Sequence, residues 1–301
     1  MKIKKVVVTG AAGFIGQALV KYLVRTGSEV IAVDRVIVNI PGCSFHQADI
    51  IEQGVLDNLL CKETVLFHMA ARASVEGSVV DPRNDFQNNT YSLLEVLESA
   101  RKKNCKVIFP STASIYDPSN KLPLNERAYV RPTSPYAAAK VAGEAYCAAY
   151  HRSFGLNVNI ARLFSVYGIG MNRFAIHDLI RKIQHNKKEI ELLGDGNQIR
   201  DYLYIDDVVR GLVTIALNGQ PGEDYNLASG IEVKMIDLAH KIATLMEFPN
   251  IKIIPTGKSF AGDVPQWYAD ITKIKQIGFS QEVSFEEGLI KTINWLTNET
   301  K

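Results

Sequence analysis

The chain has 301 residues, of which 47% are hydrophobic and 22% are charged. These fractions are those of ordinary folded proteins and exclude a disordered chain, a collagen and a disulfide-rich mini-protein. Thirty-four lysines and arginines against 32 acidic residues leave a net charge of +2. This small excess gives no electrostatic reason to expect nucleic acid or a membrane surface as a partner. At about 150 residues per domain, the length predicts one large domain or two small ones.

The cysteine pattern and the hydropathy favour a cytoplasmic protein without a metal site. The cysteines are Cys43, Cys61, Cys105 and Cys147. They form no Cys-x-x-Cys pair and no His-rich spacing accompanies them, so reduced thiols of a cytosolic protein are expected. No apolar stretch approaches the roughly 18 residues of a membrane span. The basic start before residues 6–8 is similar to a signal peptide, but the apolar run stops at Thr9 and we reject that interpretation.

Short β-branched runs alternate with helical patterns along the first half of the chain. The predicted strands are residues 6–8, 30–33, 65–68 and 107–109. The clearest helical patterns between them are residues 13–25 and 93–102. Continuous apolar strands separated by helices indicate a parallel sheet that is covered on both faces. With right-handed crossovers, this pattern predicts an α/β fold with a doubly wound, Rossmann-like parallel sheet.

The second half of the chain contains two clear helix starts. Ser134, which is followed by a proline, predicts an N-cap and a helix over residues 136–151. Residues 284–287 have the pattern of a capping box for a last helix that ends near residue 295. After about residue 168 the spacing becomes irregular and richer in glycine and proline. We therefore expect a smaller C-terminal α/β domain, interleaved with the end of the sheet.

A glycine-rich segment, Thr9-Gly-Ala-Ala-Gly-Phe-Ile-Gly16, lies directly after the first predicted strand and opens the first helix. We expect Gly10 to make a tight turn, Gly13 to let the backbone approach a pyrophosphate, and Gly16 to allow close packing of helix and strand. The exposed amides and the helix dipole would then attract the dianion. A dinucleotide site is predicted at this point.

Asp34 ends the second predicted strand, where a carboxylate accepts hydrogen bonds from the hydroxyls of the adenosine ribose. The same carboxylate would repel a 2′-phosphate. The neighbouring Arg35 has the opposite tendency, because an arginine at this place can bind that phosphate. We predict NAD as the cofactor, with NADP as the alternative that Arg35 leaves open.

Tyr136 and Lys140 stand four residues apart on one predicted helix, so their side chains lie on the same face, one turn apart. A phenol has an ordinary pKa near 10. We expect the neighbouring ammonium to lower the pKa of Tyr136 and make it a usable base. Thr112 ends an earlier strand and supplies a hydroxyl for the same centre.

With these motifs the chain resembles the extended short-chain dehydrogenase/reductases, in the branch of NAD-dependent nucleotide-sugar epimerases and dehydratases. The matching segments are residues 9–16, 48–50, 68–82, 111–116, 132–144, 162–168 and 194–202. The resemblance implies the following NAD-binding residues: Gly10, Gly13, Phe14, Ile15, Gly16, Asp34, Arg35, Asp49, Ile50, Met69, Ala70, Ala71, Asn89, Tyr136 and Lys140. It also implies an NAD-binding domain of residues 1–167, completed by about residues 203–227. Residues 168–202 and 228–301 would form the nucleotide-sugar domain.

The resemblance further implies a mechanism. Tyr136 would take the proton from the 4-hydroxyl of the sugar while C4 gives its hydride to NAD⁺. Thr112 would hydrogen-bond the same oxygen, and Lys140 would bind the nicotinamide ribose. In a 4-epimerase the 4-keto sugar turns over and the hydride returns to its other face, so no external oxidant is needed.

Several positions bear on the substrate and the reaction. The residues expected to contact the nucleotide sugar are Ser74, Thr112, Ser165, Arg173, Arg200 and Trp267. Related 4,6-dehydratases carry acidic residues directly after the catalytic threonine, where this chain has Ala113 and Ser114. Neither can be a general acid or base near neutral pH, which disfavours dehydration and favours 4-epimerisation of a UDP-hexose.

Two departures concern the sugar nucleotide. Ser165 stands where the family usually has asparagine, and Phe260 where an arginine usually contacts the diphosphate. Arg200 is the matched diphosphate ligand, and Lys258 or Arg173 would compensate for the missing arginine. Trp267 would exclude an N-acetyl group at C2 and favour a plain hexose; equally, it would pack in the core or in an interface.

Other interpretations stay open at this point. A nucleotide-sugar reductase, a dehydratase or a 3,5-epimerase would share most of these motifs, and a non-catalytic NAD-binding sensor would share the glycine loop. The resemblance also suggests a homodimer through the helices near residues 86–103 and 135–152. His68 is interpreted as a packing residue. Arg72 replaces a usual polar residue, and the sequence offers no account of it.

Overall fold

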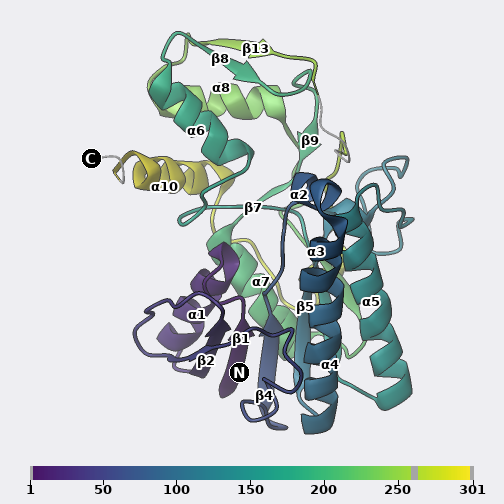
Figure 1. The fold of residues 1–301 in the computed structure, drawn as a ribbon. Helices are drawn as coiled ribbons and strands as arrows, with labels where there is room; N and C mark the ends of the chain where they lie inside the picture. Colours follow the sequence, from purple (N-terminus) through teal and green to yellow (C-terminus); the bar gives the residue numbers. More distant parts are fainter. Residues whose placement is uncertain (1–2, 259–263, 299–301) are drawn as a thin grey trace.

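The computed structural model describes residues 3–258 and 264–298 and is centred on one seven-stranded sheet (Figure 1). The strand order is β11-β6-β5-β4-β1-β2-β3, and every neighbouring pair is parallel. The strands are β1 (Lys5–Thr9), β2 (Glu29–Asp34), β3 (Ser44–Gln47), β4 (Thr64–His68), β5 (Lys106–Thr112), β6 (Val158–Leu163) and β11 (Asp224–Leu227). The predicted doubly wound α/β sheet is confirmed.

Both faces of this sheet are buried, as continuous apolar strands require. Val6 and Val8 of β1 lie in one hydrophobic cluster and Val7 lies in the other. Helices α1 (Phe14–Arg25) and α7 (Ile205–Asn218) supply the first cluster, and α4 (Ser92–Lys103) and α5 (Pro135–Phe154) supply the second. Alternate side chains of each strand therefore pack against different helix layers.

The helix starts that the sequence predicts are present. Ser134 caps α5 by accepting a hydrogen bond from Ala137 N at 3.2 Å, and a proline follows it as the first helical residue. Gly155 ends the helix in the left-handed conformation, with φ of 66°. Ser284 accepts from Glu287 N at 3.2 Å at the start of α10 (Phe285–Asn298). Local capping chemistry thus determines both starts.

The rest of the chain forms small sheets and helices at one end of the large sheet (Figure 1). The described residues of this part form three strand pairs: β7 (Ser165–Tyr167) with β10 (Tyr202–Tyr204), β8 (Glu189–Leu192) with β13 (Lys252–Pro255), and β9 (Ile199–Arg200) with β12 (Val233–Lys234). The accompanying helices are α6 (Ala175–His185), α8 (Met235–Leu245), α9 (Thr272–Gln276) and α10. None of the helices within the described ranges is long and apolar enough to cross a membrane.

Strand β6 is an element that the sequence analysis did not name. Its sequence, Val-Asn-Ile-Ala-Arg-Leu, places Asn159 and Arg162 in the interior, where both are almost fully buried. Polar residues at core positions break the apolar pattern by which a buried strand is recognised. Segments far along the chain supply the partners of the Arg162 guanidinium and of the Asn159 amide nitrogen, which accounts for polar residues inside this strand.

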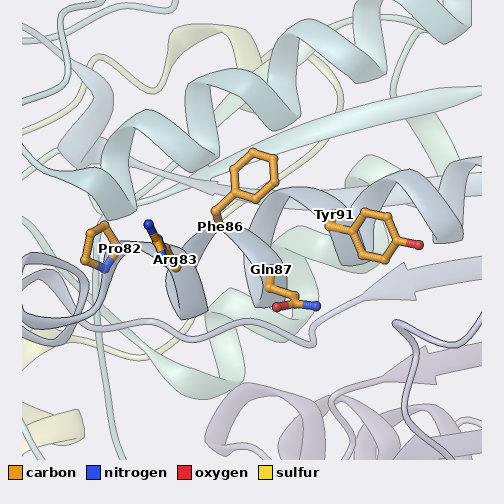
Figure 2. A pocket seen from close by; sticks show the side chains of 5 residues that line it. All are labelled: Pro82, Arg83, Phe86, Gln87 and Tyr91. Atoms are coloured by element: carbon orange, nitrogen blue, oxygen red, sulfur yellow. The ribbon is translucent and has the colours of Figure 1, made fainter.

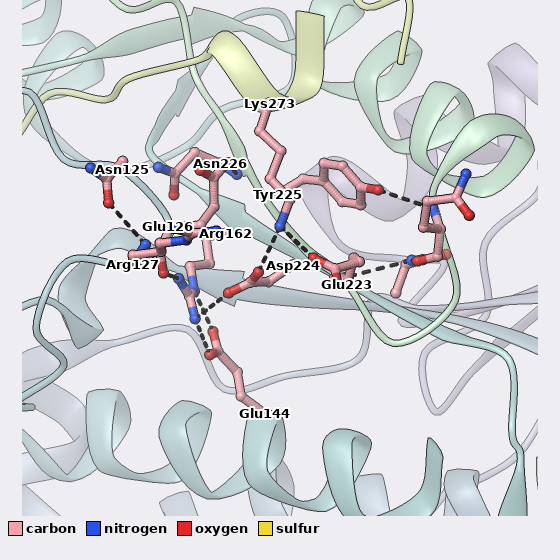
Figure 3. A network of polar contacts seen from close by, with 12 residues as sticks. Asn125, Glu126, Arg127, Glu144, Arg162, Glu223, Asp224, Tyr225, Asn226 and Lys273 are labelled. Carbon is pink, nitrogen blue, oxygen red and sulfur yellow. Dashed lines mark hydrogen bonds and ion pairs between the residues drawn. The ribbon is translucent and has the colours of Figure 1, made fainter. Parts of the chain in front are cut away.

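The partners of the Arg162 side chain come from several elements (Figure 3). Its guanidinium pairs with Glu144 of α5 at 2.7 Å and with Asp224 of β11 at 2.6 Å. It also donates to the Tyr116 hydroxyl at 3.0 Å. Lys273 of α9 reaches Asp224 at 3.0 Å, so one network joins the last two strands of the sheet to helices from both parts of the chain.

Replacing Glu144 by glutamine should destabilise the fold, because it leaves the buried guanidinium of Arg162 with one carboxylate fewer. We expect Glu144→Gln to lower the free energy of unfolding, measured by urea denaturation, by roughly 2–3 kcal/mol. The matched control is Glu287→Gln, which breaks an exposed i,i+4 pair with Lys291 and should cost about 0.5 kcal/mol or less. Equal effects of the two variants would contradict this account of the network.

Candidate active site

The glycine-rich turn after β1 lies against the backbone that follows β4. Gly10 has φ of 67°, and a Cβ there would overlap the main chain of Met69 and Ala70. A Cβ on Gly16 would overlap the carbonyl of Gly10, where α1 passes over the turn. The tight turn and the close helix packing that the sequence predicts are therefore confirmed, and each excludes any side chain for a steric reason.

The N-terminus of α1 opens from this turn. Gly13 is its N-cap, and among the described residues no side chain caps the helix. Asp34 at the end of β2 accepts a hydrogen bond from Ala12 N at 2.9 Å and another from Val36 N at 3.0 Å. The carboxylate thus fastens the glycine turn to the tip of the next strand, and its remaining lone pairs are available to a ligand.

Arg35 points to Asp49 rather than standing as an isolated cation. Its guanidinium lies 3.5 Å from the Asp49 carboxylate, and 62% of the Arg35 side chain is exposed. Asp49 also accepts from Ile51 N at 3.2 Å, and Ile50 between them is buried. With two carboxylates beside it, Arg35 offers little net positive charge to a 2′-phosphate, which agrees with the choice of NAD.

The ends of β1 and β4 are joined at the point where the strand order reverses. Thr9 Oγ1 lies 3.0 Å from His68 Nδ1, and Met69 N donates to Thr9 O at 3.0 Å. Burial and the charge of Lys140 lower the pKa of His68 to about 3, so the ring is neutral. His68 stacks on Phe109 with ring centroids 6.3 Å apart, as expected of a packing residue.

The structure brings Thr112, Tyr136 and Lys140 together where β5 ends beside the start of α5. The phenol of Tyr136 is hydrogen-bonded to the Thr112 side chain. Lys140 is buried; its Nζ donates to Pro110 O at 2.8 Å and lies 4.8 Å from the centre of the Phe109 ring. The carbonyl and the ring face stabilise an ammonium that has little water around it.

The expected effect of Lys140 on the phenol is wrong for the chain by itself. Burial raises the pKa of Tyr136 to about 12, although the Thr112 bond and the charge of Arg173 act in the other direction. Burial also lowers the pKa of Lys140 to about 8. Desolvation favours the neutral form of each group. This effect is larger than the lowering of the Tyr136 pKa that the four-residue spacing from Lys140 led us to expect.

Asn89 holds the segment after β4 in place. It lies in a π-helical turn, η1 (Gln87–Tyr91), and its side-chain oxygen accepts from Arg72 N at 2.8 Å. Ser74 caps α2 (Val75–Val80) by accepting from Gly77 N at 3.0 Å. The structure therefore gives both residues a local structural partner, and their contacts to cofactor and substrate stay predictions.

Arg200 and Trp267 lie against each other on the substrate side. The guanidinium carbon of Arg200 is 4.2 Å from the centre of the Trp267 ring, and Arg200 Nη1 donates to Pro265 O at 3.1 Å. The indole Nε1 is a buried donor without a partner within the described ranges. A flat cationic and aromatic surface of this kind suits a nucleotide diphosphate.

Asp201 is a residue of this side that sequence reasoning missed. It is fully buried and accepts from Ser229 N at 2.8 Å, Gly230 N at 2.9 Å and Ala269 N at 3.2 Å. Its own carbonyl accepts from Ser165 N at 2.9 Å. In the sequence, Asp201 is an acidic residue between Arg200 and an apolar strand. Local patterns place such a residue on the surface, so they do not reveal its burial.

The remaining predicted substrate residues are less closely grouped. Arg173 is exposed, with its guanidinium carbon 4.7 Å from the centre of the Phe174 ring, and Phe174 has φ of 73°. Phe260, the second departure from the usual pattern, lies outside the described residues. No three His, Cys, Asp or Glu side chains in the described part of the chain gather as metal ligands would.

Comparison with known proteins identifies the family. The model of the NAD dependent epimerase/dehydratase family matches residues 6–228. The chain belongs to this family. The match spans every strand of the large sheet and both residues of the Tyr136–Lys140 pair.

Other members of the epimerase/dehydratase family match over nearly the full chain. A putative UDP-glucose 4-epimerase of Methanocaldococcus jannaschii is 32% identical over 98% of this chain and 99% of that protein. A dTDP-glucose 4,6-dehydratase of Haemophilus influenzae is 30% identical over 96% and 97%. The structure of a UDP-N-acetylglucosamine 4-epimerase from Methanobrevibacter ruminantium, in complex with UDP-N-acetylmuramic acid, has a TM-score of 0.91 and 29% identity over 99% and 100%.

NAD is the cofactor of the family, and the carboxyl edge of this sheet fits it. The uncapped N-terminus of α1 suits the pyrophosphate, and a Cβ on Gly13 would meet only the carbonyl of Gly10, so space remains beside it. Asp34 stands at the tip of β2, where the ribose hydroxyls belong.

Alanine at Gly10 should remove NAD binding for a steric reason that alanine at Gly155 lacks. Both glycines have φ near 66°, so each substitution costs about 1–2 kcal/mol of backbone strain. Only Gly10 lies against another backbone, whereas a Cβ at Gly155 meets nothing within 4 Å. We expect Gly155→Ala protein to retain its NAD, measured after denaturation, and Gly10→Ala protein to lose it. Retention of NAD by both variants would contradict the packing argument.

Proposed function

We propose that this chain is a nucleotide-sugar 4-epimerase that acts on a UDP-hexose through a transient 4-keto intermediate. The observation that carries the proposal is the set of groups beside the Thr112 hydroxyl. Tyr136 and Lys140 supply proton-transfer chemistry for one sugar hydroxyl, whereas the two positions after Thr112 hold the buried Ala113 and the half-buried Ser114. The Ser114 hydroxyl accepts a hydrogen bond from Thr112 at 3.2 Å. No acid follows the threonine to move protons at C5 and C6.

The roles of the residues follow from their chemistry. When bound, NAD supplies a hydride acceptor for C4 of the sugar. The Tyr136 oxygen receives the proton of the 4-hydroxyl, and the Thr112 hydroxyl orients that oxygen by a hydrogen bond. Lys140, held by Pro110 O, keeps a positive charge beside the phenol and binds the nicotinamide ribose. For the return step the phenol gives the proton back, so the protein ends each cycle unchanged.

Charge near the phenol is needed because burial raises the pKa of Tyr136 to about 12. A base with this pKa keeps its proton at neutral pH unless cations lower it. Lys140, whose pKa burial lowers to about 8, is still protonated at pH 7. Activity therefore needs a phenol that has lost its proton beside an ammonium that has kept it, and it should fall at high pH as Lys140 loses its proton.

The substrate side supports a nucleotide diphosphate and, with less force, a plain hexose. Arg200 is a positioned cation, and the indole of Trp267 lies beside it with a donor that has no partner among the described residues. In this proposal the residues around the large sheet hold NAD and those of the small sheets hold the sugar nucleotide. The free thiols of all four cysteines support a reducing compartment, the cytoplasm.

Dehydration is the second candidate, because a dTDP-glucose 4,6-dehydratase is among the relatives. Ala113 and Ser114 argue against it. A net oxidoreductase would exchange NAD(H) with the solution, whereas an epimerase keeps it bound. A non-catalytic sensor would have no need of Thr112, Tyr136 and Lys140 together.

The test uses the purified protein with nothing added. We expect NAD to be released in stoichiometric amount on denaturation, and UDP-glucose and UDP-galactose to interconvert without added cofactor, followed at C4 by NMR. N-acetylated UDP-sugars should react more slowly because of Trp267. Tyr136→Phe should lower kcat by roughly 10²–10⁴-fold with NAD still bound. Absence of NAD and of any UDP-sugar turnover would overturn the proposal, and a consumption of added NADH would favour a reductase.

We further propose a homodimer through the face formed by α3 (Pro82–Phe86), η1 and α5. This face carries the exposed side chains of Phe86, Tyr91, Tyr146 and Phe154. Figure 2 shows Phe86 and Tyr91 among the residues that line a shallow pocket there of about 470 Å³. Exposed aromatic side chains gathered on one face are typical of a protein interface.

Light scattering tests the dimer. The wild-type protein should have about twice the 33.4 kDa mass of one chain, and Phe86→Glu should reduce it to the monomer, because a charge would be buried at the interface. The control Ile290→Glu places the same charge on an exposed apolar position of α10 and should leave the dimer intact. A monomeric wild-type chain, or a dimer unaffected by Phe86→Glu, would contradict this interface.

A further inference from the structure

A buried polar cluster lies where α3 and η1 meet the segment after β4. Asn89 binds both sides of Arg72, accepting from its N at 2.8 Å and donating to its O at 3.2 Å. The same amide donates to Asp85 Oδ1 at 2.8 Å. Asp85 is a carboxylate with only 1% of its surface exposed. Asn89 thus links the backbone of Arg72, a residue for which the sequence offered no account, to the carboxylate of Asp85.

The cluster contains two polar atoms that packing does not explain. Within the described part of the chain, Asp85 Oδ2 and Arg72 Nη1 are buried and have no hydrogen-bond partner. Burying half of a carboxylate unpaired is costly, whereas an apolar side chain of similar size would cost nothing. Burial raises the pKa of Asp85, and the Asn89 hydrogen bond and the charges of Arg72 and Lys140 act against the rise.

Asp85 lies on a helix that packs against the helix of the acid–base pair. Helix α3 packs on α5, which carries Tyr136 and Lys140 (Figure 1). Burial lowers the pKa of Lys140, and the negative charge of Asp85 is the largest influence in the opposite direction. Burial raises the pKa of Tyr136, and Asp85 raises it further. One carboxylate therefore acts on both groups in the same direction.

The other charged groups around the pair come from different elements. Arg173, from the segment after β7, lowers the pKa of the phenol. Glu144 and Cys147, from the next turns of α5, raise the pKa of Lys140 against the effect of burial. His68 of β4 is neutral. Among these, Asp85 is the group that influences the phenol and the ammonium together.

We propose that Asp85, balanced by Arg72, is a positioning residue of the active centre that sets the pH range in which Tyr136 and Lys140 transfer a proton. The inference rests on the proposed function, since it takes this pair as the proton-transfer groups. Asp85 acts through the pair and not on the sugar. Its carboxylate keeps Lys140 charged to higher pH, at the expense of a phenol that releases its proton less readily.

The sign of the effect follows from charge. Replacing Asp85 by asparagine keeps the shape and the contact with Asn89 but removes the negative charge. Lys140 then loses its proton at lower pH, and Tyr136 also loses its proton at lower pH. The two limbs of the pH–rate profile report the two pKa values of this pair. Both limbs should therefore move to lower pH together.

The first experiment compares pH profiles of kcat/KM for the wild-type chain, Asp85→Asn and Asp81→Asn. Asp81 caps the same short helix and is exposed, and asparagine caps equally well, so this control makes the same chemical change without a buried charge. We expect both limbs of Asp85→Asn to shift by roughly one pH unit toward acid and those of Asp81→Asn to stay. Limbs that stay in place in Asp85→Asn, whether or not its rate falls, would overturn the proposal.

The second experiment does not depend on turnover. Protein with ¹³C-labelled lysine is titrated by NMR, as purified and with its NAD, following the ε-carbons. Burial lowers the pKa of Lys140 and of Lys106 to about 8, so both are distinguishable from the other lysines, and Lys140→Met and Lys106→Met assign them. Asp85→Asn should lower the midpoint of Lys140 by roughly one pH unit and leave Lys106 unchanged. A Lys140 midpoint that does not move in Asp85→Asn would overturn the proposal. If the midpoint moves but the wild-type chain has no epimerase activity, the effect of Asp85 on Lys140 stands and only the proposed function is contradicted.

Discussion

The whole site depends on the contact of two backbones at the point where the strand order reverses. The turn at Gly10 after β1 lies against the main chain of Met69 and Ala70 after β4, with no space for a side chain between them. Thr9 and His68 join the two strand ends from inside, and Asp34 ties the turn to β2. Because these ends are held so closely, the N-terminus of α1 faces a place where a pyrophosphate can approach the backbone.

Burial at the carboxyl edge of the sheet determines the pKa values of the two groups proposed for acid–base chemistry. It favours the neutral form of each group, raising the pKa of Tyr136 to about 12 and lowering that of Lys140 to about 8. The protein opposes the second shift with a carbonyl, a ring face and nearby carboxylates. In the proposed mechanism, proton transfer would depend less on the spacing of the two residues on α5 than on the charges that neighbouring elements place around them.

The same fold in this family carries epimerases and dehydratases, so the fold alone does not choose the reaction. The choice depends on a few side chains around one sugar carbon. Here the positions after Thr112 are occupied by small residues, and Ser114 is already engaged with the threonine hydroxyl. On the substrate side of the proposal, the buried Asp201 holds four segments together, so that Ser165, Arg200 and the segment after Trp267 lie close to one another.

The sequence by itself determined the parallel sheet, the glycine turn and the N-cap of α5, and it indicated Thr112, Tyr136 and Lys140 as the residues of the proposed acid–base centre. Each of these depends on neighbours within a few positions: apolar runs, a φ that only glycine adopts easily, a hydroxyl one residue before a proline. Only the tertiary structure decided that β6 is a core strand with a buried Arg162, that the pKa of Tyr136 is raised rather than lowered, and that Arg72 and Asp85 share one cluster. Each of these features depends on burial and charge contributed by segments far apart in the chain, such as Glu144 and Asp224 around Arg162. The periodicity of a sequence does not show which distant segments will meet.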